Sequence, residues 1–281
     1  MLRSRGQDPV APDRDELELL DLEAVRAAVR SASPPAVYHL AAQASVPASW
    51  SDPRTTLLEN FETTLNVLEA VKKEAPSAVV VVAGSGEVYG APTSLPVEES
   101  APLRPQNPYA VSKAACDLLA AQYADAHGMH VIRTRSFNQA GPGQTELYVL
   151  GTLTRQVAEA ELRGDDVATI RLGNIDSRRD FTDVRDVARA YADAVDAGAP
   201  AGAYNLCSGQ AVSVRDLLEL LGRAARIEVR HEVDPERVRA HDVPEIRGSN
   251  ERIRTAAGWT PEIPLEQTVA DALEDWRKRL A

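Results

Sequence analysis

Tyr109 and Lys113 lie four residues apart in the segment NPYAVSK at residues 107–113. This spacing places both side chains on one face of a helix. A phenol has an ordinary pKa of about 10, and a neighbouring ammonium favours its charged form. The pair could therefore exchange a proton with a carbonyl or an alcohol near neutral pH. Such proton exchange accompanies the transfer of a hydride to or from a carbon that bears oxygen.

A second chemical signal lies upstream, where a run of four valines at 79–82 precedes the small residues before Ser85. The run predicts a buried parallel strand that ends in a tight turn. Ser85 could hydrogen-bond the same oxygen as Tyr109. Glu87 follows two residues later, and it could be a base or an ordinary carboxylate at the rim of the site. A Tyr-x-x-x-Lys pair alone is more often a surface pair, so Ser85 strengthens the catalytic interpretation.

The composition excludes several classes of function. The chain has 281 residues, a formal net charge of −11 and a pI near 5.0, which argues against nonspecific binding to nucleic acid or to an anionic membrane. No apolar stretch approaches the roughly 20 residues of a membrane span, and the N-terminus lacks the apolar segment of a signal peptide. We therefore expect a soluble cytoplasmic protein. Cys116, Cys207 and the five scattered histidines predict neither a disulfide framework nor a metal site.

Strand and helix patterns alternate along the chain. Strands are expected at 36–42, 79–82 and 130–135, and helices after a cap at Asp21 and at 57–71, 109–126, 146–163, 214–225 and 267–280. This alternation predicts an α/β fold, a Rossmann-like parallel sheet with helices on both faces. The proline-rich stretches 92–108 and 235–264 are expected to be loops. We divide the chain into a dinucleotide-binding region, 1–140, and a smaller α/β region for the substrate, 141–281, interleaved with the first.

These residues together resemble the extended short-chain dehydrogenase/reductase family that acts on nucleotide sugars. The segment HLAAQ at 39–43 matches the family segment that lies along the cofactor, and Asn60 matches an asparagine of the following helix. The resemblance implies NAD or NADP as cofactor. It implies a catalytic set of Ser85, Glu87, Tyr109 and Lys113, and a cofactor-binding set of Ala41, Ala42, Gln43, Asn60, Tyr109 and Lys113.

Within that family the chain is most similar to the branch that acts on GDP-sugars. The segments 172–181, 242–248 and 258–261 resemble those of GDP-mannose 4,6-dehydratases and GDP-4-keto-6-deoxy-D-mannose reductases. The resemblance implies a GDP-sugar substrate held by Asn138, Asn174, Arg179 and Arg247. Arg179 would bind the diphosphate through its planar fork of donors. In the alternative interpretation, the arginines at 178, 179 and 185 only pair with the aspartates at 176, 180 and 183.

Three functions remain open from the sequence. The first is reduction of GDP-4-keto-6-deoxy-D-mannose to a GDP-6-deoxyhexose with NAD(P)H. The second is a GDP-mannose 4,6-dehydratase, or another nucleotide-sugar epimerase or dehydratase, in which Glu87 would be the base. The third is a non-catalytic protein that binds a sugar nucleotide. The resemblance also implies a homodimer, packed through the helices at 109–126 and 55–74.

One family feature is missing from the sequence. Members open with a strand, a Gly-x-x-Gly-x-x-Gly turn and a helix, and the turn lets the backbone approach the pyrophosphate of the dinucleotide. Here Gly6 is the only glycine before Gly84. We therefore expect the chain to begin near the third strand of the family fold, without the first βαβ unit, and to bind nicotinamide dinucleotides poorly.

Overall fold

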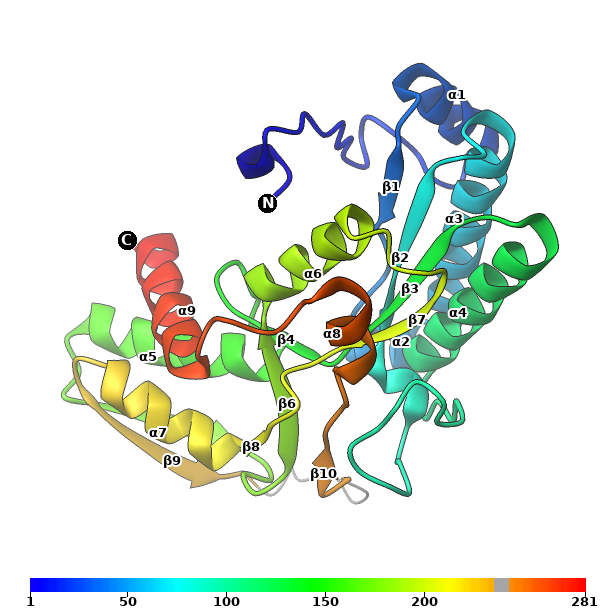
Figure 1. Cartoon of the computed structure of the whole chain (residues 1–281). Helices are drawn as coiled ribbons and strands as arrows, with labels where there is room; N and C mark the ends of the chain where they lie inside the picture. Colours follow the sequence, from blue (N-terminus) through cyan, green and yellow to red (C-terminus); the bar gives the residue numbers. More distant parts are fainter. Residues whose placement is uncertain (235–242) are drawn as a thin grey trace.

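A four-stranded parallel sheet lies at the centre of the computed structural model, which describes residues 1–234 and 243–281 (Figure 1). Its strands are β1 (Ala36–His39), β2 (Val79–Ser85), β3 (Val131–Ser136) and β7 (Gly202–Leu206), in the spatial order β1-β2-β3-β7. The side chains of β2 alternate between two cores, since Val80 and Val82 face one and Val81 faces the other. The valine run is therefore buried on both faces, as its sequence predicted.

Helices cover both faces of this sheet, which confirms the predicted fold class (Figure 1). One face carries α1 (Leu22–Ala32), α3 (Pro53–Glu74) and α4 (Pro108–His127), and the other carries α6 (Val184–Asp196) and α8 (Glu251–Ala257). Polar residues fix the helix starts. Asp21 accepts hydrogen bonds from the backbone of Glu23 and Ala24, and Asn107 accepts one from Ala110.

The remaining elements form a second layer with its own core. β6 (Arg178–Asp183) pairs with β4 (Asn138–Ala140), β8 (Ala211–Ser213) and β10 (Glu245–Ile246), and β5 (Val167–Leu172) pairs with β9 (Glu228–Val233). Around them pack α5 (Val149–Arg163), α7 (Val214–Ala224) and α9 (Leu265–Leu280). Short elements connect these parts: η1 (Arg3–Arg5), α2 (Val46–Ser51) and η2 (Gly86–Tyr89).

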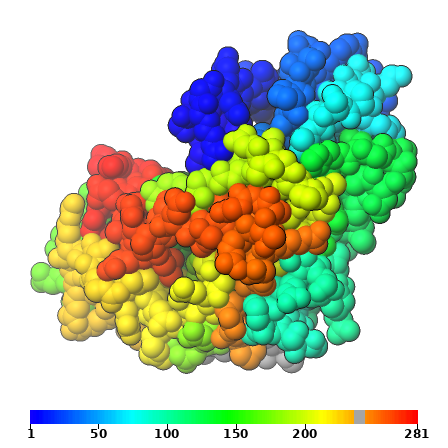
Figure 2. Space-filling model, viewed as in Figure 1, coloured from blue at the N-terminus to red at the C-terminus, as the bar shows by residue number. Residues whose placement is uncertain are grey.

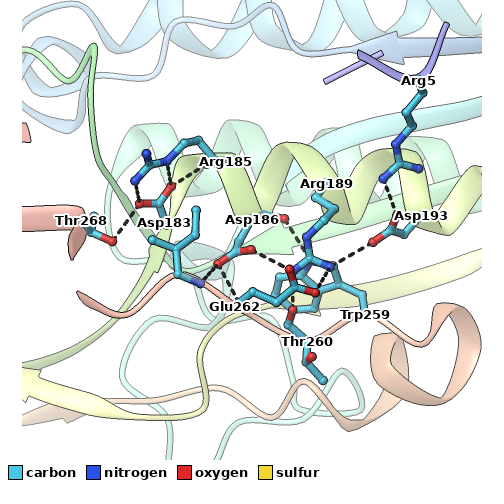
Figure 3. Close-up of polar contacts among 11 residues, drawn as sticks. Arg5, Asp183, Arg185, Asp186, Arg189, Asp193, Trp259, Thr260, Glu262 and Thr268 are labelled. Carbon is cyan, nitrogen blue, oxygen red and sulfur yellow. Dashed lines mark hydrogen bonds and ion pairs between the residues drawn. The ribbon is translucent and has the colours of Figure 1, made fainter. Parts of the chain in front are cut away.

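Helix α6 ties the two layers together (Figure 3). The carboxylate of Asp186 accepts hydrogen bonds from the backbone nitrogens of Glu262 and Ile263, both at 2.9 Å. One turn along, Arg189 bonds the Asp186 carboxylate and the carbonyl of Thr260. The N-terminal segment lies against the same helix, where Arg5 pairs with Asp193 and Asp196 (Figure 2). Residues from both ends of the chain thus converge on α6.

Several element boundaries differ from those predicted. The helix expected from residue 146 begins at Val149, and the strand expected over 36–42 ends at His39. The stretch 235–264 is not a plain loop, because it holds β10 and α8; its residues 235–242 lie outside the described part. Before Ala36 the described residues form η1 and α1 but no strand, so β1 is an edge strand of the sheet.

Within residues 1–234 and 243–281, no helix is long and apolar enough to cross a membrane. Within the same ranges, no group of three or more His, Cys, Asp or Glu side chains could hold a metal ion.

Candidate active site

The C-terminal end of β2 and the first two turns of α4 bring Ser85, Tyr109 and Lys113 together. Ser85 is the last residue of β2, and its hydroxyl accepts a hydrogen bond of 3.2 Å from the backbone of Glu87. Helix α4 begins at Pro108, so Tyr109 lies in its first turn and Lys113 one turn later. The Ser85 hydroxyl is a near neighbour of the Tyr109 phenol and acts to lower its pKa. Lys113 is buried and donates to the carbonyl of Ala83 on β2 at 2.9 Å.

The electrostatics of this group differ from the sequence expectation. Burial raises the pKa of Tyr109 to about 12 and outweighs the influence of the Ser85 hydroxyl, which acts in the opposite direction. Burial also lowers the pKa of the Lys113 ammonium. The expected phenolate is therefore not favoured, because removing a phenolate from water costs more than its neighbours recover. At neutral pH Tyr109 is a proton donor, as the reduction of a ketone requires.

The segment after β1 is held beside this group by Asn60. The backbone nitrogen of Gln43 donates to Asn60 Oδ1 at 2.8 Å, and Asn60 Nδ2 donates to the Gln43 carbonyl at 3.1 Å and to Ser112 Oγ at 2.9 Å. Asn60 thus ties the segment containing Ala41 and Ala42 to α4 beside Lys113. Both the oxygen and the nitrogen of the Asn60 amide form hydrogen bonds within the chain. The structure therefore gives Asn60 a role in holding this segment.

The dinucleotide implied by the family resemblance fits these residues at its nicotinamide end. Two buried polar atoms there have no protein partner: Gln43 Oε1, after β1, and Ser136 Oγ, at the end of β3 opposite Ser85. A ligand that carries amide and hydroxyl groups could satisfy both. The pyrophosphate end is different, because the described residues contain no glycine-rich turn between a strand and a helix.

The residues predicted to bind the substrate lie on the second layer. Asn138 on β4 is paired in register with Phe181, two residues after Arg179 on β6. Ile246 on β10 is in register with Arg179, and Arg247 comes directly after this strand, where its side chain bonds Glu245 at 3.3 Å. Asn138 and Arg179 therefore lie on strands of one small sheet, and Arg247 follows a third strand of it. Asn174 is in the turn between β5 and β6, where its side chain accepts a hydrogen bond of 3.0 Å from the backbone of residue 176.

The alternative pairing of the arginines and aspartates is only partly found. Arg185 does bond Asp183, at 2.8 Å. The buried Asp180 instead accepts hydrogen bonds from Ser208 and Gly209, and burial raises its pKa to about 6. Asp176 pairs with Arg215, and Arg178 with Glu245. Half-buried Arg179 donates to the carbonyls of Arg178 and Val243 at 2.9 and 2.8 Å.

Sequence reasoning missed two residues around the site. Asn107, whose oxygen caps α4, also donates from Nδ2 to Glu87 Oε2 at 3.1 Å. The capping pattern before Pro108 would have found its first role but not the second. Tyr148, at the start of α5, comes from the other layer, and its hydroxyl reaches the carbonyl of Ala44 after β1 at 3.4 Å. No spacing pattern in the sequence links Tyr148 to α4.

The chain is similar to a protein-family model and to several known enzymes. Residues 13–272 match the family model described as GDP-mannose 4,6 dehydratase. The chain is 40% identical over 249 residues to a GDP-6-deoxy-D-mannose reductase of Pseudomonas aeruginosa, covering 88% of this chain and 82% of that protein. It is 30% identical over 249 residues to a UDP-glucose 4-epimerase of Mycolicibacterium smegmatis, covering 88% and 77%.

A similar solved structure is that of RMD from Pseudomonas aeruginosa complexed with NADPH. It superposes with a TM-score of 0.88 at 37% sequence identity, and the match covers 97% of this chain and 90% of that one. The fold described above, including its parallel sheet and second layer, is therefore shared with a dinucleotide-binding protein.

Proposed function

This chain belongs to the GDP-mannose 4,6-dehydratase family, and we propose that it is a reductase of GDP-4-keto-6-deoxy-D-mannose that uses NAD(P)H. The observation that carries the proposal is the meeting of Ser85, Tyr109 and Lys113 where β2 ends against α4, in a chain 40% identical to a GDP-6-deoxy-D-mannose reductase. The product would be a GDP-6-deoxyhexose of the GDP-D-rhamnose type.

The chemistry of the chain itself follows from three side chains. The Ser85 hydroxyl would bind the C4 ketone oxygen and polarise it. Tyr109 would then give its proton to the same oxygen as negative charge develops on it. Lys113 would supply positive charge next to the phenol and so stabilise the phenolate that remains.

NAD(P)H, when bound, supplies the hydride for C4. Its nicotinamide ribose would be held by Tyr109 and Lys113, and its amide by the unpartnered atoms of Gln43 and Ser136. The segment containing Ala41 and Ala42 would line the cofactor, because Asn60 holds it next to α4.

The sugar nucleotide is proposed to lie mainly over the region after residue 140. Arg179 on β6 would bind the diphosphate. Arg247, which follows the neighbouring strand β10 and bonds Glu245 at 3.3 Å, is proposed to contact it as well. Asn138 on β4 would contact the sugar diphosphate closer to Tyr109, and Asn174 would contact it from the turn before β6. The burial of Asp180 beneath this sheet keeps β6 fixed against the loop at 208–209.

A 4,6-dehydratase is the second candidate, and Glu87 is the observation in its favour. Glu87 is exposed in η2, two residues after Ser85, where a base that removes a sugar proton is needed. The hydrogen bond from Asn107 holds its carboxylate in place. Sequence similarity favours the reductase, because the chain is 40% identical to a GDP-6-deoxy-D-mannose reductase and 26% identical to a GDP-mannose 4,6-dehydratase of Yersinia enterocolitica.

A homodimer is proposed from the outer faces of α3 and α4. Leu58 and Phe61 on α3 are 51% and 38% exposed, and Val111 and Leu118 on α4 are 42% and 60% exposed. Adjacent helices with this many exposed large apolar side chains form a patch that a second copy would bury. The alternative, that all of these side chains face the sheet, does not hold for these four.

The test of the proposed function is a pair of incubations followed by product analysis. A reductase converts GDP-4-keto-6-deoxy-D-mannose to a GDP-6-deoxyhexose only when NADH or NADPH is present. A dehydratase converts GDP-mannose to the 4-keto compound without added reductant. Binding of GDP-mannose with neither conversion would support the non-catalytic alternative.

A further inference from the structure

Tyr148 is a residue whose type neither helix capping nor core packing explains. It is the N-cap residue of α5, a position that favours Ser, Thr, Asp or Asn, and its side chain makes no capping hydrogen bond. Its backbone carbonyl, rather than its side chain, accepts from Thr152 at the start of the helix. The side chain is 41% exposed. A residue whose type suits neither its position in the helix nor the core is expected to serve a function.

The loop that carries Tyr148 is fixed along its length. The backbone nitrogen of Gly143 donates to Asp275 of α9 at 2.9 Å, and Arg279 of the same helix donates to the carbonyl of Gln144 at 3.1 Å. The loop also presses against α5, since a Cβ on Gly151 would lie 2.0 Å from the Thr145 carbonyl oxygen. The loop that precedes Tyr148 is therefore held in place by α5 and α9.

The Tyr148 side chain extends from α5 to the segment after β1. The Tyr148 hydroxyl donates to the carbonyl of Ala44 at 3.4 Å, across 104 residues of sequence. Ala44 directly follows Gln43, which Asn60 ties to α4. Asn60 also bonds Ser112 on α4, the residue before Lys113. Tyr148 thus spans the space between the proposed cofactor segment and the proposed sugar-nucleotide region.

The contact to Ala44 leaves the Tyr148 hydroxyl available. Its 3.4 Å separation is long for a hydrogen bond between two oxygens, which is usually about 2.7–2.8 Å. A bond this long contributes little, so a well-placed acceptor on a ligand would replace it at small cost. The aromatic ring beside the hydroxyl offers an apolar face of the kind that packs against the carbon–hydrogen face of a sugar ring.

We propose that Tyr148 contacts the hexose ring of the bound nucleotide sugar, on the side opposite Tyr109, and so distinguishes a nucleotide sugar from a bare nucleotide. This inference rests on the proposed function and adds a residue to its substrate site. The ring of Tyr148 packs on the sugar, and its hydroxyl exchanges Ala44 for a sugar hydroxyl. The diphosphate is proposed to lie in the region of Arg179.

The test is calorimetric binding of GDP-mannose and of GDP to the whole chain, without cofactor and without turnover. The variants are Tyr148→Phe, Tyr148→Ala and the control Leu147→Ala, which truncates the adjacent side chain, 61% exposed. Tyr148→Phe should weaken GDP-mannose binding about three- to tenfold, the loss expected for one neutral hydrogen bond. Tyr148→Ala should weaken it further. GDP binding should stay within about twofold throughout, and Leu147→Ala should behave as wild type.

The outcomes separate this inference from the proposed function. If wild type binds GDP but gains nothing from the sugar, or if both Tyr148 variants bind GDP-mannose as wild type does, Tyr148 does not contact the sugar. Equal losses for GDP and GDP-mannose would assign it a structural role and overturn the inference as well. If wild type binds neither ligand, the proposed substrate class is wrong and the inference falls with it. Circular dichroism checks the fold, and Tyr148→Phe keeps the test valid should Tyr148→Ala not fold.

Discussion

Replacing Tyr109 with phenylalanine removes one oxygen atom from the centre of the proposed mechanism. Tyr109 is the group held in its proton-donating form, with a pKa of about 12. General acid catalysis typically contributes about 10²–10⁴-fold in rate, which is on the order of 3–5 kcal/mol in the activation barrier. Because burial of the ring is kept, the fold should be almost unaffected. We therefore expect kcat for the 4-keto sugar to fall at least about 100-fold, with the melting temperature nearly unchanged.

The assay is steady-state oxidation of NADPH that depends on GDP-4-keto-6-deoxy-D-mannose, together with thermal unfolding of the same samples. Tyr123→Phe is the matched control, because Tyr123 is a buried tyrosine on the same helix whose hydroxyl bonds Glu69 rather than a group at the site. The control should lose some stability but keep its turnover. Turnover of Tyr109→Phe within about twofold of wild type would remove Tyr109 from the proposed proton transfer.

Four further expectations concern the ligands, the assembly and the acid stability of the protein. Arg179→Ala should weaken GDP binding by about ten- to a hundredfold, as loss of a charge-assisted hydrogen bond predicts, and Arg179→Lys should restore part of the affinity. Equal GDP affinities of wild type and Arg179→Ala in calorimetry, or an equal loss in the control Arg215→Ala, would count against a phosphate contact. The 281-residue chain should bind NADPH more weakly than micromolar because no glycine-rich turn lies before Ala36, and a micromolar Kd by nicotinamide fluorescence would refute this. Light scattering at tens of micromolar should show wild type as a dimer and Leu118→Glu as a monomer, because the introduced carboxylate would be buried in the dimer interface. A monomeric wild type would exclude the dimer. Burial lowers the pKa of His39 to about 4, below its ordinary 6.5, so the contribution of neutral His39 to the free energy of unfolding is complete above pH 6.5 and is lost as the pH falls through 4. The loss is on the order of 3 kcal/mol. A urea titration in which His39→Asn shows the same acid loss as wild type would refute this expectation.

Much of the fold could be predicted from the sequence because the patterns that predict it are local. The valine run, the Asp21 cap and the periodic apolar residues of α3 each reflect short-range preferences that the packed structure keeps. The boundaries that failed depend on tertiary contacts. The helix expected from residue 146 starts at Val149 because the preceding loop is held by α9, more than 100 residues later in the chain.

The site was partly predictable for a similar reason. The spacing of Tyr109 and Lys113 fixes them on one helix face, and the end of a strand fixes Ser85. The direction of the Tyr109 pKa shift was not predictable, because it depends on how deeply the assembled layers bury the phenol. Tyr148 could not be found either, since only the folding of the loop at 141–147 onto α5 and α9 brings it towards Ala44.

The most direct test of the proposed reductase is isotopic. The chain is incubated with GDP-4-keto-6-deoxy-D-mannose and with NADPH or NADH deuterated at the nicotinamide C4, at a cofactor concentration raised until the rate saturates. Our account predicts a GDP-6-deoxyhexose that carries one deuterium at sugar C4, formed at a rate that collapses in Tyr109→Phe. Unchanged 4-keto substrate, or a product without deuterium at C4, would contradict it.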